Sequence, residues 1–140
     1  MTKHTYSYNT QHLLRDGKPW LPAMGEFHFS RYPDAYWRDS IRLMKAGGID
    51  IVSSYVMWIH HGPVEGAFDF SGCRNIKKFL HICAEEDMAV ALRIGPWING
   101  EVRNGGFPNW LLSVPGIRTN NPAYLGCIRR YWSALYEQIK

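Results

Sequence analysis

The sequence predicts an α/β fold, namely the N-terminal part of a (β/α)8 (TIM) barrel. Strand-like apolar runs alternate with amphipathic helical segments along the 140 residues, and no Gly-x-Gly-x-x-Gly motif follows any of the runs. Strands joined by helices pair in parallel, and without that phosphate-binding motif a barrel is favoured over a doubly wound sheet. A complete barrel needs about 250 residues, so we expect a truncated one of about three βα units preceded by a β-hairpin.

The first thirty residues predict the hairpin and the first barrel strand. Residues 6–14 have the composition of a strand, and Asp16-Gly17 is a tight-turn pair. Residues 19–29 form a second extended run, which is expected to pair with the first strand and then to enter the core.

Residues 34–47 are predicted to form a helix, and residues 49–58 the strand that follows it. Asp34 suits a first turn and Gly47-Gly48 a helix end. The strand is almost wholly apolar or small and rich in β-branched residues, which is typical of a strand covered on both faces. The apolar helix positions, at i, i+4 and i+7, are Trp37, Ile41 and Met44.

The same order of helix and strand then repeats. Residues 75–86 are predicted to be helical and residues 88–94 to form the third parallel strand. After a long Gly- and Pro-rich loop, Asn121 and Pro122 suit the cap and the first turn of a last helix. The apolar positions of that helix are Tyr124, Ile128, Tyr131, Trp132, Leu135 and Ile139.

Composition excludes several classes of function. The net charge of +4 comes from scattered residues, so no nucleic-acid partner is expected. No apolar run approaches the ~20 residues of a membrane helix, so no membrane association is expected either. The three cysteines lack a C-x-x-C spacing, and no metal or other cofactor is indicated. The N-terminus has no signal-like apolar segment, so a cytoplasmic location is expected.

The loop after the third strand has the residue types of a sugar-binding site. Asn99 and Glu101 alternate with apolar or small neighbours, so both side chains would face one side if the backbone stayed extended. Trp97 and Trp110 offer flat apolar faces for a pyranose ring. A solvated loop with two core tryptophans would give the same pattern.

The ends of the first two barrel strands carry further candidates. Glu26 and His28 are two residues apart, so they could share the inner face of a barrel as buried polar support for the site. His60 and His61 are adjacent, and neighbouring strand residues point to opposite faces, so a metal site is not expected there. From the pattern alone, Glu101 would be the best candidate for a general acid.

A series of motifs resembles glycoside hydrolase family 35 from about Gly17 to the end of the chain. The motifs occur in the family's order and with its spacing. They are Gly25-Glu-Phe-His-Phe-Ser-Arg-Tyr-Pro33, Trp37-Arg-Asp39, Met44-Lys-Ala-Gly47, Ser54-Tyr-Val-Met-Trp58, Phe68-Asp-Phe-Ser-Gly72, Arg93-Ile-Gly-Pro-Trp-Ile-Asn-Gly-Glu101 and Gly105-Gly-Phe-Pro-Asn-Trp-Leu111.

The resemblance implies a retaining β-galactosidase, of which residues 1–140 are the N-terminal portion of the catalytic domain. In the family, glutamates after strands four and seven act as acid/base and nucleophile, so no catalytic residue is expected in this chain and both are expected beyond Lys140. The residues matching Tyr55, Asn99 and Glu101 bind galactose hydroxyls. Glu26, His28, Trp58, His61 and Trp97 are expected to support that site.

The chain departs from the family after its second strand. Many members have Pro-Trp-Asn-x-His-Glu-Pro where this chain has Met57-Trp-Ile-His-His-Gly-Pro63, so the leaving-group specificity is left open. Trp97 also replaces a tyrosine. Two alternatives to a β-galactosidase stay open: a non-catalytic carbohydrate-binding module, and a retaining β-glycosidase with another sugar preference. Glutamates on later strands would distinguish the enzymes from the module.

Overall fold

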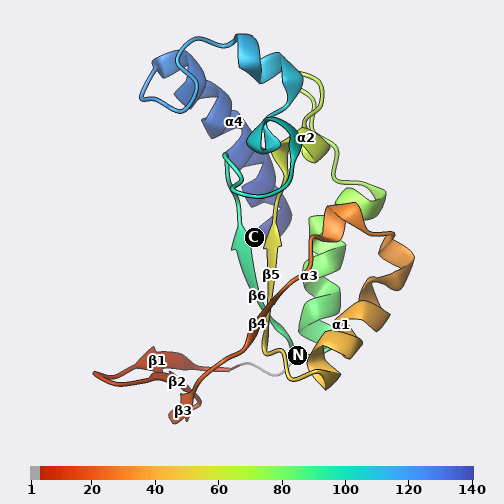
Figure 1. Ribbon diagram of the computed structural model, residues 1–140, viewed down its shortest axis with the longest axis vertical. Coiled ribbons are helices and arrows are strands. Elements are labelled where there is room, and N and C mark those ends of the chain that lie inside the picture. The colour runs from red at the N-terminus through yellow and green to blue at the C-terminus, as the bar shows by residue number, and fades with distance from the viewer. Residues whose placement is uncertain (1–3) are drawn as a thin grey trace.

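The computed structural model describes residues 4–140, which form two small sheets and a set of helices (Figure 1). One sheet is an antiparallel meander at the N-terminus, in the order β1-β2-β3. The other is parallel, in the order β4-β5-β6, and carries the helices. The α/β class and the alternation of strands with helices are therefore confirmed.

The meander consists of β1 (Tyr6–Tyr8), β2 (Leu13–Arg15) and β3 (Lys18–Trp20). The predicted turn at Asp16-Gly17 joins β2 to β3, and both turn residues have positive φ. The prediction of a single strand over residues 6–14 is wrong, because the chain reverses after β1. There the Asn9 side chain accepts hydrogen bonds from the N–H groups of Gln11 and His12, which closes a tight turn.

The parallel sheet consists of β4 (Met24–Glu26), β5 (Ile51–Tyr55) and β6 (Ala89–Arg93). Each strand is shorter than predicted. The extended run of residues 19–29 is divided between the two sheets, because β3 pairs with β2 whereas β4 pairs in parallel with β5.

Three longer helices follow the parallel strands: α1 (Trp37–Ala46), α3 (Ile76–Glu85) and α4 (Pro122–Ile139). The N-cap of α3 is Asn75 and that of α4 is Asn121, and both side chains accept a backbone N–H of the first turn. A short helix, α2 (Trp58–His61), replaces the end of the predicted strand 49–58. The described part of the chain also contains five 3-10 turns: η1 (Phe29–Arg31), η2 (Asp34–Tyr36), η3 (Gly72–Arg74), η4 (Arg103–Gly106) and η5 (Asn109–Ser113).

The core lies on one face of the parallel sheet. Val52 of β5 is fully buried there with Ile41 of α1 and Phe79 of α3, and Figure 1 shows these two helices side by side next to the sheet. Phe79 also stacks on Phe29, with 4.9 Å between ring centroids. The other face of the sheet is not covered by these helices, and its side chains form the candidate site described below.

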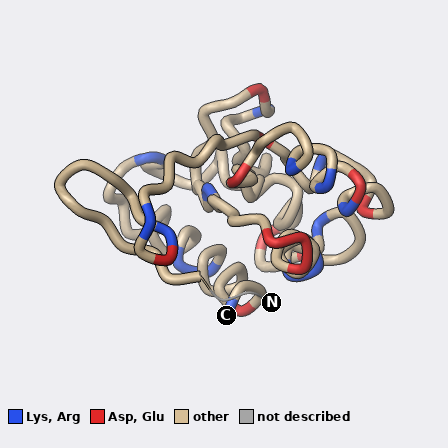
Figure 2. The backbone as a smooth tube through the Cα atoms, turned by 90° about the horizontal axis from the view of Figure 1, so that it is seen from below, with Lys and Arg blue, Asp and Glu red and all other residues tan. Residues whose placement is uncertain are grey.

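Charged residues are distributed along the chain rather than gathered on one face (Figure 2). Arg38 and Arg42 of α1 pair with Glu86 just after α3, which joins the two helices at the surface. Within residues 4–140, no helix is both long and apolar enough to cross a membrane.

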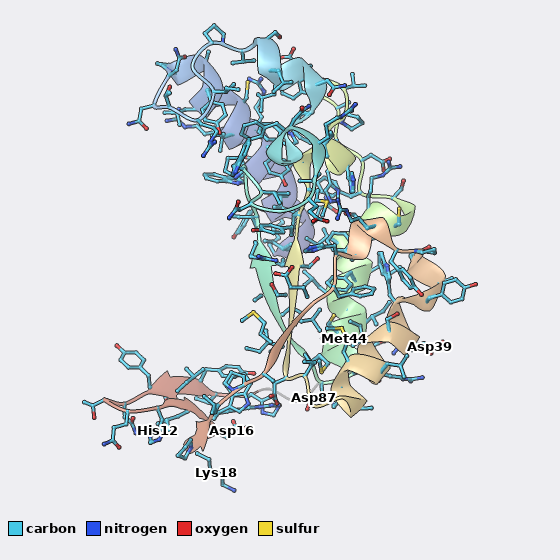
Figure 3. All side chains as sticks on the ribbon, viewed as in Figure 1. His12, Asp16, Lys18, Asp39, Met44 and Asp87 are labelled. Carbon is cyan, nitrogen blue, oxygen red and sulfur yellow. The ribbon has the colours of Figure 1, made fainter. Side chains whose placement is uncertain are left out.

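His4 ties the N-terminal meander to the parallel sheet. Its Nδ1 lies 2.7 Å from an Asp16 oxygen and its Nε2 lies 3.0 Å from an Asp87 oxygen. Figure 3 labels both aspartates, Asp16 on the meander and Asp87 just before β6. Arg15 also contacts His4 and Asp87. Hydrogen bonds to Asp16 and then to Asp87 raise the pKa of His4 above its ordinary value of 6.5, against opposing effects of desolvation and Arg15.

Replacement of His4 by glutamine is expected to lower the melting temperature at pH 5.5 but much less at pH 9. Because the pKa of His4 is raised in the folded state, the contacts of the charged ring contribute their full stabilisation below pH 6.5. That contribution is lost as the pH rises through the folded-state pKa of His4. The pKa values of Asp16 and Asp87 are lowered from 3.8, so the contact is also lost in acid. Thermal unfolding at the two pH values measures the difference. His12→Gln, at an exposed position on the same meander, is the control. An equal effect of the His4 substitution at both pH values would contradict this interpretation.

Candidate functional site

The candidate site lies at the carboxyl ends of the three parallel strands. Glu26 pairs in register with Ser53, and Tyr55 pairs with Arg93. Because side chains alternate along a strand, Glu26, Tyr55 and Arg93 all project from the face opposite to the one that carries the core residue Val52. Three different strands therefore bring a carboxylate, a phenol and a guanidinium together on one surface.

Glu26 and Arg93 form an ion pair across the sheet, from β4 to β6. The Glu26 side chain is 54% exposed, so residues 4–140 by themselves do not bury it. Burial of Glu26 in a complete barrel stays a prediction.

His28 completes this group of charged and polar residues. Its Nε2 lies 3.3 Å from Oε2 of Glu26, and the backbone N–H of Tyr55 donates to its Nδ1 at 3.4 Å. Burial is the main cause that lowers the pKa of His28 below 6.5, and Glu26 opposes it. The ring is therefore neutral at pH 7, with Nδ1 as acceptor and Nε2–H directed at Glu26.

The Tyr55 ring lies between the cationic side chain of Arg93 and the polar ring of His28. The guanidinium carbon of Arg93 is 3.6 Å from the centroid of the Tyr55 ring, and the ring of His28 is tilted against it at 5.6 Å. A Cβ atom placed on Gly100 would be 3.8 Å from Cε2 of Tyr55. The loop after β6 therefore passes close to this ring.

That loop leaves Asn99 and Glu101 exposed. The backbone does not stay extended through these residues, because β6 ends at Arg93 and the chain then bends. Ile98 is 2% exposed, and its N–H donates to the carbonyl of Gly105 at 2.8 Å, which fixes the loop. Arg31 donates to the backbone carbonyl of Glu101. The carboxylate and the amide are thus free to meet a ligand, although simple alternation does not position them.

The two tryptophans of the loop have neighbours of their own. The guanidinium of Arg118 lies 4.1 Å from the centroid of Trp97, and a Cβ on Gly105 would come within 2.3 Å of the same ring. The faces of Trp97 are therefore largely occupied, although its side chain is 38% exposed. Trp110 donates to the carbonyl of Gly62 and meets Trp58 edge to face at 5.8 Å.

Trp58 and His61 lie on α2, and both side chains are buried. Trp58 is fully buried and stacks on Tyr131 of α4, with 4.5 Å between the ring centroids and 5° between the planes. His61 is also fully buried, and its Nδ1 lies 3.2 Å from the carbonyl of Asp69. Burial lowers the pKa of His61 to about 4, so it is neutral and donates to that carbonyl. Neither side chain is exposed to a ligand.

His60 and His61 lie on helix α2 rather than on a strand, so the reason expected for their separation is wrong. Their side chains nevertheless contact different residues. Nδ1 of His60 lies 2.8 Å from the hydroxyl of Ser30, whereas His61 faces the carbonyl of Asp69. Among residues 4–140, no group of three or more His, Cys, Asp or Glu side chains is arranged to hold a metal ion.

Two loop contacts of the site illustrate what the sequence did not predict. Arg31 reaches Glu101 from η1, and Arg118 reaches Trp97 from the loop before α4. The first contact joins residues 70 positions apart. No local pattern in the sequence indicates such contacts, because they depend on how the loops fold over the sheet.

The chain is similar to known proteins of one family. The model of the family described as glycosyl hydrolases family 35 matches residues 12–140. The chain is 35% identical over 138 residues to a beta-galactosidase of Canis lupus familiaris, 36% identical over 138 residues to one of Xanthomonas manihotis, and 35% identical over 135 residues to one of Homo sapiens. These matches cover 97%, 97% and 95% of the chain, and 21%, 23% and 20% of the relatives.

The chain thus spans about a fifth of the length of these curated relatives. Among solved structures, the exo-beta-1,4-mannosidase Op5Man5 from Opitutaceae bacterium strain TAV5 has a similar fold, with a TM-score of 0.62 at 17% sequence identity. That match covers 89% of this chain and 23% of the mannosidase chain. With the family model matching nearly the whole chain and curated relatives at about 35% identity, the chain belongs to glycosyl hydrolases family 35.

Proposed function

We propose that this chain is the N-terminal part of a (β/α)8-barrel catalytic domain, in an enzyme that hydrolyses terminal β-galactosides with retention of configuration. The whole enzyme is taken to contain these residues and to have the length of the curated relatives, which are named beta-galactosidases. In this proposal the chain supplies part of the galactose-binding site, and both catalytic glutamates belong to the rest of the barrel.

The observation that carries the proposal is the cluster at the carboxyl ends of β4, β5 and β6. In barrel enzymes, substrate is bound at this end of the strands by residues from several of them. Here Glu26, Tyr55 and Arg93 come from three neighbouring strands and share one face. The face opposite carries the core residues and the helices. This supports the proposal, because the helices of a barrel cover the outer side of its strands.

The chemistry of the exposed groups suits a sugar. A carboxylate at Glu101 can accept hydrogen bonds from two hydroxyls, and such charge-assisted bonds are short and directional. This directionality discriminates an axial from an equatorial hydroxyl, which is the difference between galactose and glucose. We assign Asn99 and the Tyr55 hydroxyl to the same ligand, since Gly100 brings this part of the loop beside the Tyr55 ring.

Glu26 is less suited to act on the glycosidic bond. Its Oε1 is bound by Arg93 and its Oε2 lies 3.3 Å from His28, so both oxygens already have partners. Retaining hydrolysis needs two carboxyl groups about 5–5.5 Å apart on either side of the bond. We therefore assign binding and support to the residues of this chain, and bond cleavage to the glutamates of the remaining barrel.

The whole enzyme is expected to hydrolyse nitrophenyl β-galactoside faster than the matching β-glucoside or β-mannoside, whereas residues 1–140 alone give no hydrolysis above background. Release of nitrophenol measures the rates, and NMR of the first sugar released shows whether the β-anomer is retained. A preference for another glycoside would instead support a β-glycosidase of different specificity. Galactose binding without any hydrolysis by the whole protein would support a binding module.

A further inference from the structure

We propose that Arg93 is a positioning residue, which holds the Tyr55 ring so that its hydroxyl faces the bound sugar. Glu26 in turn fixes the guanidinium of Arg93. This inference rests on the proposed function, because it assigns a role within the same sugar-binding site.

The geometry gives Arg93 direct control of the Tyr55 ring. The two residues are partners in register on β5 and β6, so their side chains leave the sheet from adjacent positions. The guanidinium carbon lies only 3.6 Å from the ring centroid, within the range of a stacked cation–π contact. A planar guanidinium stacks on a ring in a way that the compact ammonium group of lysine cannot reproduce.

Glu26 restrains the arginine from the other side. It binds the guanidinium from β4, two strands away from β6, while its second oxygen faces His28. His28 itself lies against Tyr55 and receives the Tyr55 backbone N–H. The four side chains therefore form a closed ring of contacts, in which displacement of Arg93 releases both Glu26 and Tyr55.

The ion pair contributes little to folding, which points to a role at the site. The Arg93 side chain is 36% exposed and that of Glu26 is 54% exposed, and ion pairs so accessible to water have little effect on stability. The contacts that Arg93 and His28 make to Tyr55 are to its ring and its backbone, so the hydroxyl is left to a ligand. The consequence of the cluster is therefore the orientation of one hydroxyl.

The test is a double-mutant cycle of Arg93→Met and Tyr55→Phe in the whole enzyme, read as kcat/KM for nitrophenyl β-galactoside. Arg93→Met alone is expected to lower kcat/KM about three- to thirtyfold, mainly by raising KM. Arg93→Lys is expected to retain part of the activity that Arg93→Met loses, and Glu26→Gln is expected to lose less than Arg93→Met. In the Tyr55→Phe background, Arg93→Met is expected to have almost no further effect, because the hydroxyl that it positions is absent. Additive losses would mean that Arg93 binds the sugar itself and would overturn the proposal.

The matched control is Arg38→Met on α1. Arg38 is 38% exposed and pairs with Glu85 and Glu86, so the substitution breaks a surface ion pair of similar exposure away from the site. If Arg93→Met and Arg38→Met changed the melting temperature by the same amount, and also changed kcat/KM by the same amount, Arg93 would be only a structural residue. Failure of the unmodified enzyme to act on the galactoside would defeat the proposed function instead. In that case NMR of the Tyr55 ring, with and without Arg93, still tests whether the arginine orders the ring.

Discussion

Replacement of Trp58 by alanine is expected to lower the free energy of unfolding by about 3–5 kcal/mol, the usual range for removal of a buried tryptophan. Trp58 is fully buried and stacks on Tyr131, which itself donates a 2.9 Å hydrogen bond to the carbonyl of Val56. Phe107 and Trp110 meet the Trp58 ring edge to face. No neighbour can fill the space of an indole without moving one of these rings.

The loss is measured by denaturant unfolding of the whole protein. Trp132→Ala is the control, because Trp132 lies on α4 and is 39% exposed, so its loss is expected to cost about 1 kcal/mol or less. If both substitutions changed stability equally, the stack on Tyr131 would not be the main support of this region. We expect the Trp58 substitution to disturb the candidate site as well, because Trp58 begins α2 just after the strand that ends with Tyr55.

The larger elements of the fold could be predicted because they depend on local patterns. The last helix begins where Asn121 and Pro122 indicate, since a side-chain cap and a proline at the first turn act within a few residues. The apolar, β-branched residues within 49–58 likewise predicted a parallel strand covered on both faces; β5 is parallel, and Val52 is fully buried on the face that the helices cover. Its other face is not covered by helices within residues 4–140. Patterns of this kind need no knowledge of the partner segment.

The errors arose where distant contacts or a single turn decide the structure. The strand predicted for residues 49–58 ends early, at Tyr55, and its last predicted residue, Trp58, begins α2 and packs on a tyrosine 73 positions later in the chain. The turn after β1 depends on one side chain, Asn9, in a stretch that otherwise has the composition of a strand. A periodicity argument detects neither.

The candidate site was predicted in its position but not in its contacts. Glu26, Tyr55 and the loop of Glu101 were all expected at strand ends, and all lie there. The register between β5 and β6 sets Arg93 opposite Tyr55, and register is not contained in the alternation of either strand. The exposure of Glu26 within residues 4–140 does not follow from its position on a strand, because it depends on what lies opposite this face of the sheet.

Replacement of Glu101 by alanine in the whole enzyme is expected to lower kcat/KM for nitrophenyl β-galactoside by roughly ten- to hundredfold. A hydrogen bond to a charged group is worth about 1.5–3 kcal/mol, and each 1.36 kcal/mol is about a tenfold change in rate. The Glu101 side chain is exposed, and its loop is held by Ile98 and by the contact of Arg31 with the Glu101 carbonyl, neither of which the substitution removes. The melting temperature should therefore stay close to that of the unmodified enzyme.

The expected loss should be specific to the sugar and to the carboxylate. If Glu101 binds the hydroxyl that distinguishes galactose from glucose, the alanine variant loses more activity on the β-galactoside than on the β-glucoside, so its preference between the two sugars shrinks. Glu137→Gln, at a position 57% exposed on α4, is the matched control and should change neither rate. Unchanged kinetics on both sugars in the Glu101 variant would show that this carboxylate is only a solvated loop residue. Under the proposed function, galactose recognition would then rest on Tyr55, Asn99 and residues of the remaining barrel.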